Sequence, residues 1–215
     1  MQFSNLAAIA VLGLASLTTA HPHKRSVDLV EALKILAPKS VSCASAKKPD
    51  ECRTAEQAAP FLEAGFKKYG LVSDNAKAAA LGLVSLESGD FQYKRNAFPG
   101  RPGQGTVNMQ MPNFNLEYAR SIPELAPQVA NITTTEGLSD AELNRMLGLL
   151  VESDEYNFAS VSWFVKWKCP EVRCALAKDV NQGYRDYMAC VEVDPDNEER
   201  MASFKLAKQA FGITA

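Results

Sequence analysis

The chain of 215 residues contains 23 basic and 25 acidic residues, which gives a formal net charge of −2. The basic residues form no stripe along the sequence, so we expect no binding to nucleic acid. Beyond the first 20 residues no run is apolar enough to cross a bilayer, and we expect no membrane anchor. The length is sufficient for one domain with a substantial core.

The first 25 residues have the pattern of segments that are removed during export. Residues 1–20 combine an apolar stretch with small residues at the end, which predicts a secretory signal peptide. Residues 21–25 end in the dibasic pair Lys24-Arg25 and are interpreted as a pro-segment. The mature chain is then residues 26–215, a single domain of net charge −4 that we expect to be secreted and extracellular. Asn131 begins an Asn-Ile-Thr acceptor for N-glycosylation, which agrees with export.

Apolar residues recur at helical spacing along most of the mature chain, which predicts a mainly α fold. Thr54 is a plausible N-cap, with Gln57 three residues later as in a capping box. Pro170 is suited to the first turn of a helix. Helices are predicted over residues 27–36, 54–69, 76–87, 139–151, 153–167 and 196–211, with one helical segment over 170–188.

Residues 90–112 depart from this helical pattern. Apolar or aromatic residues alternate with polar ones around Tyr93 and again around Met109, and a segment rich in glycine and proline separates the two stretches. Period-two alternation interrupted by such a segment predicts a short β-ribbon or an extended loop.

In an oxidising compartment, the odd number of cysteines predicts either two disulfides and one free thiol or an intermolecular disulfide. Cys43 and Cys52 are nearest to each other and enclose a polar loop, so we expect them to pair. Cys169, at a helix start, is the preferred partner of Cys190, and Cys174 is then expected to be a buried free thiol. The two histidines lie at positions 21 and 23, so we expect no metal site built from Cys and His.

Glu87 is the first candidate for chemistry. The helix predicted over residues 76–87 has almost no polar face and should be buried, and Gly89 is placed to end it. A carboxyl group in the last turn faces the negative end of the helix dipole beside apolar neighbours. Both conditions disfavour the charged form of a carboxyl group, as suits a general acid.

Together these residues resemble the lysozyme-like superfamily. Glu87-Ser88-Gly89 followed by Gly105-x-x-Asn108-Met109-Gln110-x-Pro112 is similar to the soluble lytic transglycosylases and goose-type lysozymes. Tyr156-Asn157-Phe158-Ala159 is similar to the Tyr-Asn-Ala-Gly element of those proteins, and residues 159–164 resemble a helix of plant-type chitinases. The sequence departs from the pattern in a glycine-to-glutamine segment that is two residues longer and in Phe-Ala after Tyr156-Asn157.

The resemblance implies an α+β lysozyme-like fold and a secreted, monomeric enzyme without a cofactor. This enzyme would cleave β-1,4-linked N-acetylhexosamine polymers, either peptidoglycan or chitin, as polysaccharide partners. Glu87 would be the general acid. Asn108 and Gln110 would bind the sugar, Met109 would pack below them, Tyr156 would orient Glu87 and Tyr93 would stack on a sugar ring.

Simpler interpretations stay open for each of these residues. A glutamate at a helix end is commonly a solvated surface residue, and tyrosine or methionine at these positions commonly fills the core. The charged run at residues 194–200 is most simply a solvated helix start. Two other functional classes also remain: a secreted glycan-binding or effector-like protein without turnover, and a structural helical protein. The sequence does not separate hydrolysis from transglycosylation.

Overall fold

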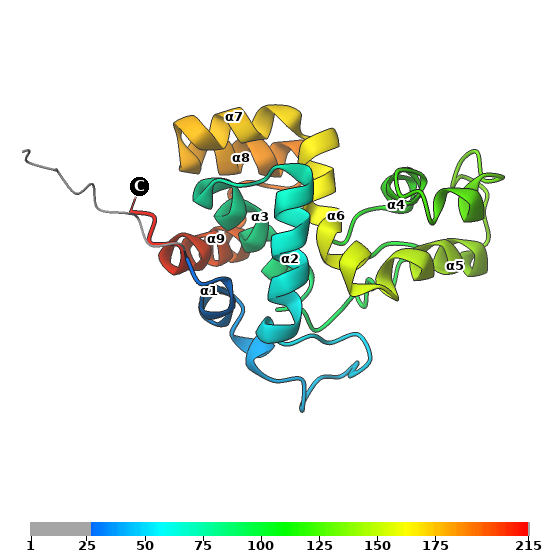
Figure 1. The fold of residues 1–215 in the computed structure, drawn as a ribbon, viewed down its shortest axis with the longest axis horizontal. Coiled ribbons are helices and arrows are strands. Elements are labelled where there is room, and N and C mark those ends of the chain that lie inside the picture. Colours follow the sequence, from blue (N-terminus) through cyan, green and yellow to red (C-terminus); the bar gives the residue numbers. More distant parts are fainter. Residues whose placement is uncertain (1–26, 215) are drawn as a thin grey trace, which may run out of the picture.

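The computed structural model describes residues 27–214, so the predicted signal peptide and pro-segment lie outside the described residues. Within that range the protein is mainly helical, as predicted (Figure 1). None of its helices there is long and apolar enough to cross a membrane. The α-helices are α1 (Leu29–Leu36), α2 (Ala55–Tyr69), α3 (Asp74–Glu87), α4 (Pro112–Arg120), α5 (Asp140–Val151), α6 (Asp154–Trp167), α7 (Pro170–Lys178), α8 (Val180–Cys190) and α9 (Glu198–Ala210), and the short 3₁₀ helices are η1 (Pro38–Val41) and η2 (Ala126–Val129).

Helix α3 lies at the centre of the fold. Ser73 caps its start by accepting a hydrogen bond from the backbone N–H of Ala76, and the ten positions from Ala76 to Ser85, with the exception of Lys77, are buried. Helix α9 packs along α3, and α1, α6, α7 and α8 also contact it. A helix that is apolar on nearly every side is stable only when neighbours cover it in this way. The predicted burial of this helix is confirmed.

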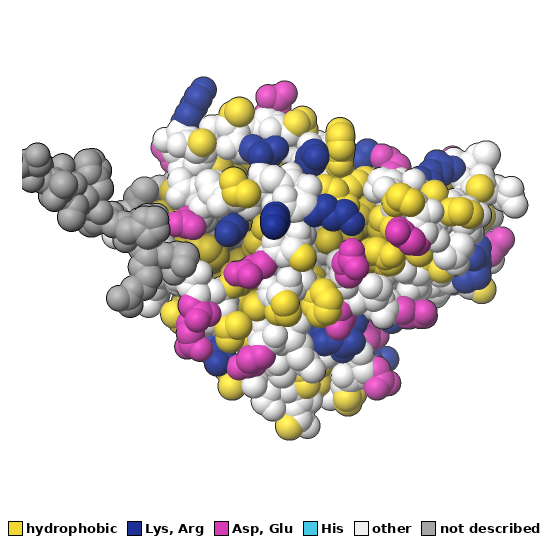
Figure 2. Space-filling view, viewed as in Figure 1, with side chains coloured by type: hydrophobic (Ala, Val, Ile, Leu, Met, Phe, Trp, Pro, Cys, Tyr) yellow, Lys and Arg dark blue, Asp and Glu magenta, His cyan; other side chains and the backbone are white. Residues whose placement is uncertain are grey.

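The second close helix pair is α2 with α6, which lie side by side in Figure 1. The predicted capping box at the start of α2 is present, because Thr54 and Gln57 each accept a hydrogen bond from the other's backbone N–H. Gly65 allows the close approach, since a Cβ atom at this position would lie 2.9 Å from the Cα atom of Ala159 in α6. On the face shown in Figure 2, acidic and basic side chains are interspersed with apolar ones.

Two helical elements differ from the sequence prediction. The segment 170–188 is broken at Asp179, which has an extended backbone and caps α8 by accepting hydrogen bonds from the N–H groups of Asn181 and Gln182. Helix α4 was not predicted, although Pro112 at its first position is a common helix start. The apolar residues of α4 are too few to give a clear period of 3.6.

Residues 90–111 form an extended loop rather than a β-ribbon. The described residues show only isolated bridges here, joining Gly105 to Arg95 on one side and to Gln110 on the other. No longer ladder can form, since the backbone has positive φ angles at Thr106 and Met109, which are incompatible with a regular strand. Of the two predicted alternatives, the extended loop is the correct one.

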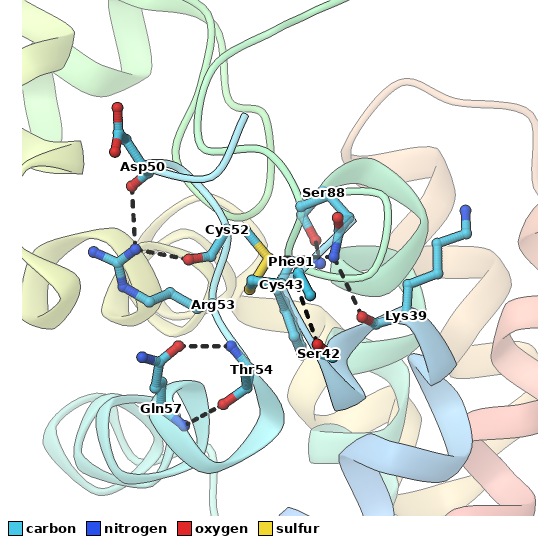
Figure 3. The surroundings of a disulfide bond; sticks show 12 residues. Lys39, Ser42, Cys43, Asp50, Cys52, Arg53, Thr54, Gln57, Ser88 and Phe91 are labelled. Atoms are coloured by element: carbon cyan, nitrogen blue, oxygen red, sulfur yellow. Dashed lines mark hydrogen bonds between the residues drawn. A yellow bond between two sulfur atoms is a disulfide. The ribbon is translucent and has the colours of Figure 1, made fainter. Parts of the chain in front are cut away.

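Both predicted disulfides are present, Cys43–Cys52 and Cys169–Cys190. Figure 3 shows the first, beside the start of α2, where Arg53 donates hydrogen bonds to the carbonyl groups of Asp50 and Cys52. The expectation for Cys174 was wrong: this free cysteine is exposed. It lies on the outer side of the short helix α7, whose buried positions are Val172 and Leu176.

Gly65→Ala should destabilise the protein by about 2 kcal/mol, because the added methyl group would press on the backbone of α6. Gly148→Ala is the matched control, since a Cβ atom there would meet only the flexible end of the Glu152 side chain. The control should be neutral or gain up to about 1 kcal/mol from helix propensity. Urea unfolding measures both, and equal effects of the two substitutions would contradict the close α2–α6 approach.

Candidate functional site

The site begins where α3 ends in a sharp turn. The hydroxyl group of Ser88 donates to the carbonyl of Val84 and accepts from the backbone N–H of Phe91. Asp90 and Phe91 both have positive φ angles, which are uncommon for residues other than glycine. The carboxylate of Asp90 accepts a hydrogen bond from the backbone N–H of Lys39. The turn directs the following loop across the end of α3.

Glu87 is paired with Arg200, a residue that the sequence interpretation missed. An Nη atom of Arg200 donates to Glu87 Oε1 at 3.0 Å, and the two side chains are only 20% and 24% exposed. Glu87 is the last residue of α3, and Arg200 lies in the first turn of α9. Each charge is therefore at the helix end where the dipole disfavours it, and the pair offsets both costs. The sequence placed Glu87 beside apolar neighbours, but in the structure its carboxylate also contacts the Arg200 guanidinium group.

A hollow of about 440 Å³ opens beside this pair, and we call it the Glu87 hollow. Its volume lies within the range of small-molecule sites. The polar groups that line it come from Glu87, Arg101, Gln104, Asn108, Gln110, Glu192 and Arg200. Its apolar side chains are Leu83, Met109, Met111, Phe114, Phe164, Val191 and Val193.

The structure brings Glu87, Asn108, Met109 and Gln110 together around this hollow. Gln110 is 4% exposed, however, and its amide group is used inside the loop. It accepts from Asn108 Nδ2 and donates to Asn115 Oδ1. Asn108 Oδ1 in turn accepts from the hydroxyl groups of Thr106 and Ser160. These amides hold the loop in shape against α6.

The two predicted tyrosines lie apart from each other. Tyr93 lines a neighbouring hollow together with Glu87, Met109 and Arg200, so it belongs to the same region. Tyr156 lines neither of these two hollows; its backbone carbonyl accepts a hydrogen bond from Tyr118, and its side chain packs at the edge of the core. The structure therefore does not bring Tyr156 to Glu87.

Two buried polar atoms at the Glu87 hollow have no hydrogen-bond partner among the described residues. They are the acceptor Gln104 Oε1 and the donor Arg200 Nε. Gln104 is fixed by its own amide nitrogen, which donates to the carbonyl of Met109 at 3.0 Å. An unsatisfied buried polar group costs about 1–3 kcal/mol, so a polar partner for either atom would stabilise the protein.

A buried ion cluster fixes the base of the loop. Lys94, which is 4% exposed, donates to Asp154 at 2.5 Å, and Arg53 donates to the other carboxylate oxygen at 2.6 Å. Burial alone would raise the pKa of Asp154, but hydrogen bonds from Arg53 and Lys94 outweigh it and hold the pKa below its ordinary value of 3.8. Burial lowers the pKa of Lys94, and Asp154 offsets part of that change.

The described residues contain no group of three or more His, Cys, Asp or Glu side chains that could hold a metal ion. Both histidines of the chain precede the described range.

Part of the chain is similar to a curated protein. A region of 159 residues is 52% identical to a "bifunctional dioxygenase (DOX)-epoxy alcohol synthase (EAS)" from Fusarium oxysporum (strain Fo5176). The match covers 73% of this chain and 12% of that protein, so the chain corresponds to a small part of the relative. No family model matches the chain. No solved structure matches it either.

These findings overturn the resemblance to lysozyme-like proteins and the function derived from it. The relative is named for oxygenation and epoxy alcohol synthesis, so the predicted glycosidase acting on peptidoglycan or chitin of a cell wall is wrong. The resemblance rested on short motifs, and the amides of Asn108 and Gln110 within them serve the loop itself. The expected polysaccharide partner rested on the same motifs and stays a prediction. The roles predicted for Glu87, Met109 and Tyr93 as site residues also stay predictions.

Asp154→Asn should destabilise the protein by about 3 kcal/mol, because it leaves the buried Lys94 ammonium without a carboxylate. Asp154 has a lowered folded pKa, so its contribution is present above pH 3.8 and is lost as the pH falls below that value. The difference in the free energy of unfolding between wild type and Asp154→Asn should therefore become smaller at lower pH. Chemical unfolding at pH values between about 3 and about 7, spaced about one pH unit apart, measures this trend.

Glu155→Gln is the matched control, since it removes the same charge from the same helix turn but from an exposed pair with Lys68. Its effect should stay below about 1 kcal/mol. The double variant Lys94→Met/Asp154→Asn should be more stable than Asp154→Asn alone, because the unpaired ammonium is gone. A double variant that is as unstable as the single one would contradict this account.

Proposed function

We propose that this chain is a binding module for an oxygenated, largely apolar small molecule, which it holds in the Glu87 hollow. The observation that carries the proposal is a pair of buried atoms without a hydrogen-bond partner among the described residues, one donor on Arg200 and one acceptor on Gln104, on residues that line a hollow with polar and apolar side chains in equal number. Pockets of this composition orient a ligand through a few polar groups and bind it through apolar contact.

An epoxy alcohol has the chemistry that this hollow requires. The epoxide oxygen only accepts hydrogen bonds and would accept from Arg200 Nε, while the hydroxyl group would donate to Gln104 Oε1. The hydrocarbon body would lie on Met109, Phe164 and Val193. The name of the Fusarium relative includes an epoxy alcohol synthase, which supports this choice of ligand class.

Arg200→Lys tests the proposal, because lysine keeps a positive charge for Glu87 but lacks the Nε donor. The variant should bind a medium-chain epoxy alcohol about tenfold more weakly, the equivalent of about 1.4 kcal/mol, as measured by calorimetric titration. The parent alcohol without the epoxide should bind wild type and variant equally. Arg185→Lys is the control, since Arg185 pairs with Asp196 away from the hollow.

Three results would contradict the proposal. The first is that neither compound saturates the wild-type protein. The second is that Arg200→Lys weakens binding of the alcohol as much as binding of the epoxy alcohol. The third is that Arg185→Lys weakens binding of the epoxy alcohol to the same extent as Arg200→Lys. Thermal unfolding of each variant shows whether the fold is intact before binding is compared.

We also propose that the chain is exported. Two disulfides among the described residues and the exposed position of Asn131 support export, since both features suit an oxidising compartment. Expression in a secreting eukaryotic host should deliver the chain to the medium with Ser26 as its first residue. Asn131→Gln should remove the mass of one glycan, and retention of the unmodified chain inside the cells would contradict the proposal.

A further inference from the structure

A second hollow lies beside the Glu87 hollow, and most of the charged side chains that line it are basic. It has a volume of about 520 Å³ and is lined by Lys47, Lys48, Arg95 and Arg101, with Glu51 as its single carboxylate. We call it the basic hollow. It shares Arg101 and Gln104 with the Glu87 hollow, so the two lie next to each other along the loop.

The four basic side chains of the basic hollow outnumber its one carboxylate, so the hollow has an excess of positive charge. No ion pair joins Lys47, Lys48, Arg95 or Arg101 to a carboxylate within residues 27–214. Glu51 is directed to the backbone instead, because its Oε2 atom accepts hydrogen bonds from the N–H groups of Lys94 and Arg95 at 2.9 and 3.1 Å. Four cations therefore gather here in a chain whose net charge is −2. Their mutual repulsion has a cost that a bound anion would remove.

The segments that carry these cations are held in place. The Cys43–Cys52 disulfide closes the loop with Lys47 and Lys48, and the Lys94–Asp154 contact fixes the residue before Arg95. The backbone N–H groups of Gly100 and Arg101 both donate to Asn96 Oδ1. A site whose groups are positioned before binding loses less entropy when the ligand arrives.

We propose that the basic hollow binds a multiply charged oxyanion, of the phosphate or carboxylate type. The two guanidinium groups can bind either kind in a bidentate manner, and the two ammonium groups add charge. Tyr93 and Phe98 complete the wall with rings 6.5 Å apart. This inference goes beyond the proposed function and does not depend on it, since Lys47, Lys48 and Arg95 do not line the Glu87 hollow.

Calorimetric titration with tripolyphosphate and, separately, with citrate tests the inference and distinguishes the two kinds of oxyanion. Wild-type protein should bind at least one of them at a single saturable site, and added salt should weaken the binding. Lys48→Gln/Arg95→Gln should lower the affinity at least about tenfold. Lys178→Gln/Lys205→Gln is the matched control, because it removes the same charge from two exposed lysines elsewhere.

The inference is overturned if neither anion saturates the wild-type protein, or if both double variants lose affinity equally, which would show an effect of net charge alone. If Lys48→Gln/Arg95→Gln unfolds at a lower temperature than wild type, Lys47→Gln/Lys48→Gln replaces it, since both lysines are exposed and substitution leaves the core untouched. Neither anion reports on epoxy alcohol binding, so this inference and the proposed function fail separately.

Discussion

The ion pair between Glu87 and Arg200 is the interaction on which the candidate site depends. It joins the end of α3 to the start of α9 across 113 positions of sequence. Both charges oppose the dipole of their own helix, so neither position would favour its residue in isolation. The pair offsets both unfavourable helix-dipole interactions, and the Nε donor of Arg200 is buried without a partner among residues 27–214. Residues that are unfavourable in their own helix and are stabilised by a distant contact are typical of functional sites.

The loop over residues 90–111 gives the region its shape although it contains almost no regular structure. Lys94 is bound to Asp154 at one end, and Asn115 donates to the carbonyl groups of Gly103 and Gln110 at the other. Buried side chains thus supply the hydrogen bonds that a β-ladder would otherwise provide. This loop forms part of the wall of both hollows, so their geometry follows from its internal bonds.

Much of the fold could be predicted from the sequence, because it depends on local signals. Helical periodicity identified most helices, and the capping box of Thr54 and Gln57 marked the start of α2 correctly. The pairing of both disulfides followed from spacing and helix position. The break at Asp179 was missed because a cap inside an apolar helical pattern gives no change of period.

The site was predictable only in part, because its essential contacts are distant in sequence. Glu87, Asn108 and Met109 were identified and do share a hollow, but no local pattern linked Glu87 to Arg200. A basic residue in the first turn of a helix is a weak sign that a carboxylate lies nearby. The interpretation of the chemistry failed for a related reason. A short motif such as Asn108-Met109-Gln110 identifies polar residues, but it does not show whether their amide groups point toward a ligand or bind within the loop.

The most direct test of the central claim is to observe the Nε–H group of Arg200 itself. Nitrogen-15 NMR spectra of the arginine Nε–H groups, recorded while a medium-chain epoxy alcohol is added, report on this donor without any substitution. The account predicts a saturable shift of the Arg200 signal, with the Arg185 signal unchanged. An Arg200 signal that does not move while the ligand binds, or that moves together with Arg185, would contradict it.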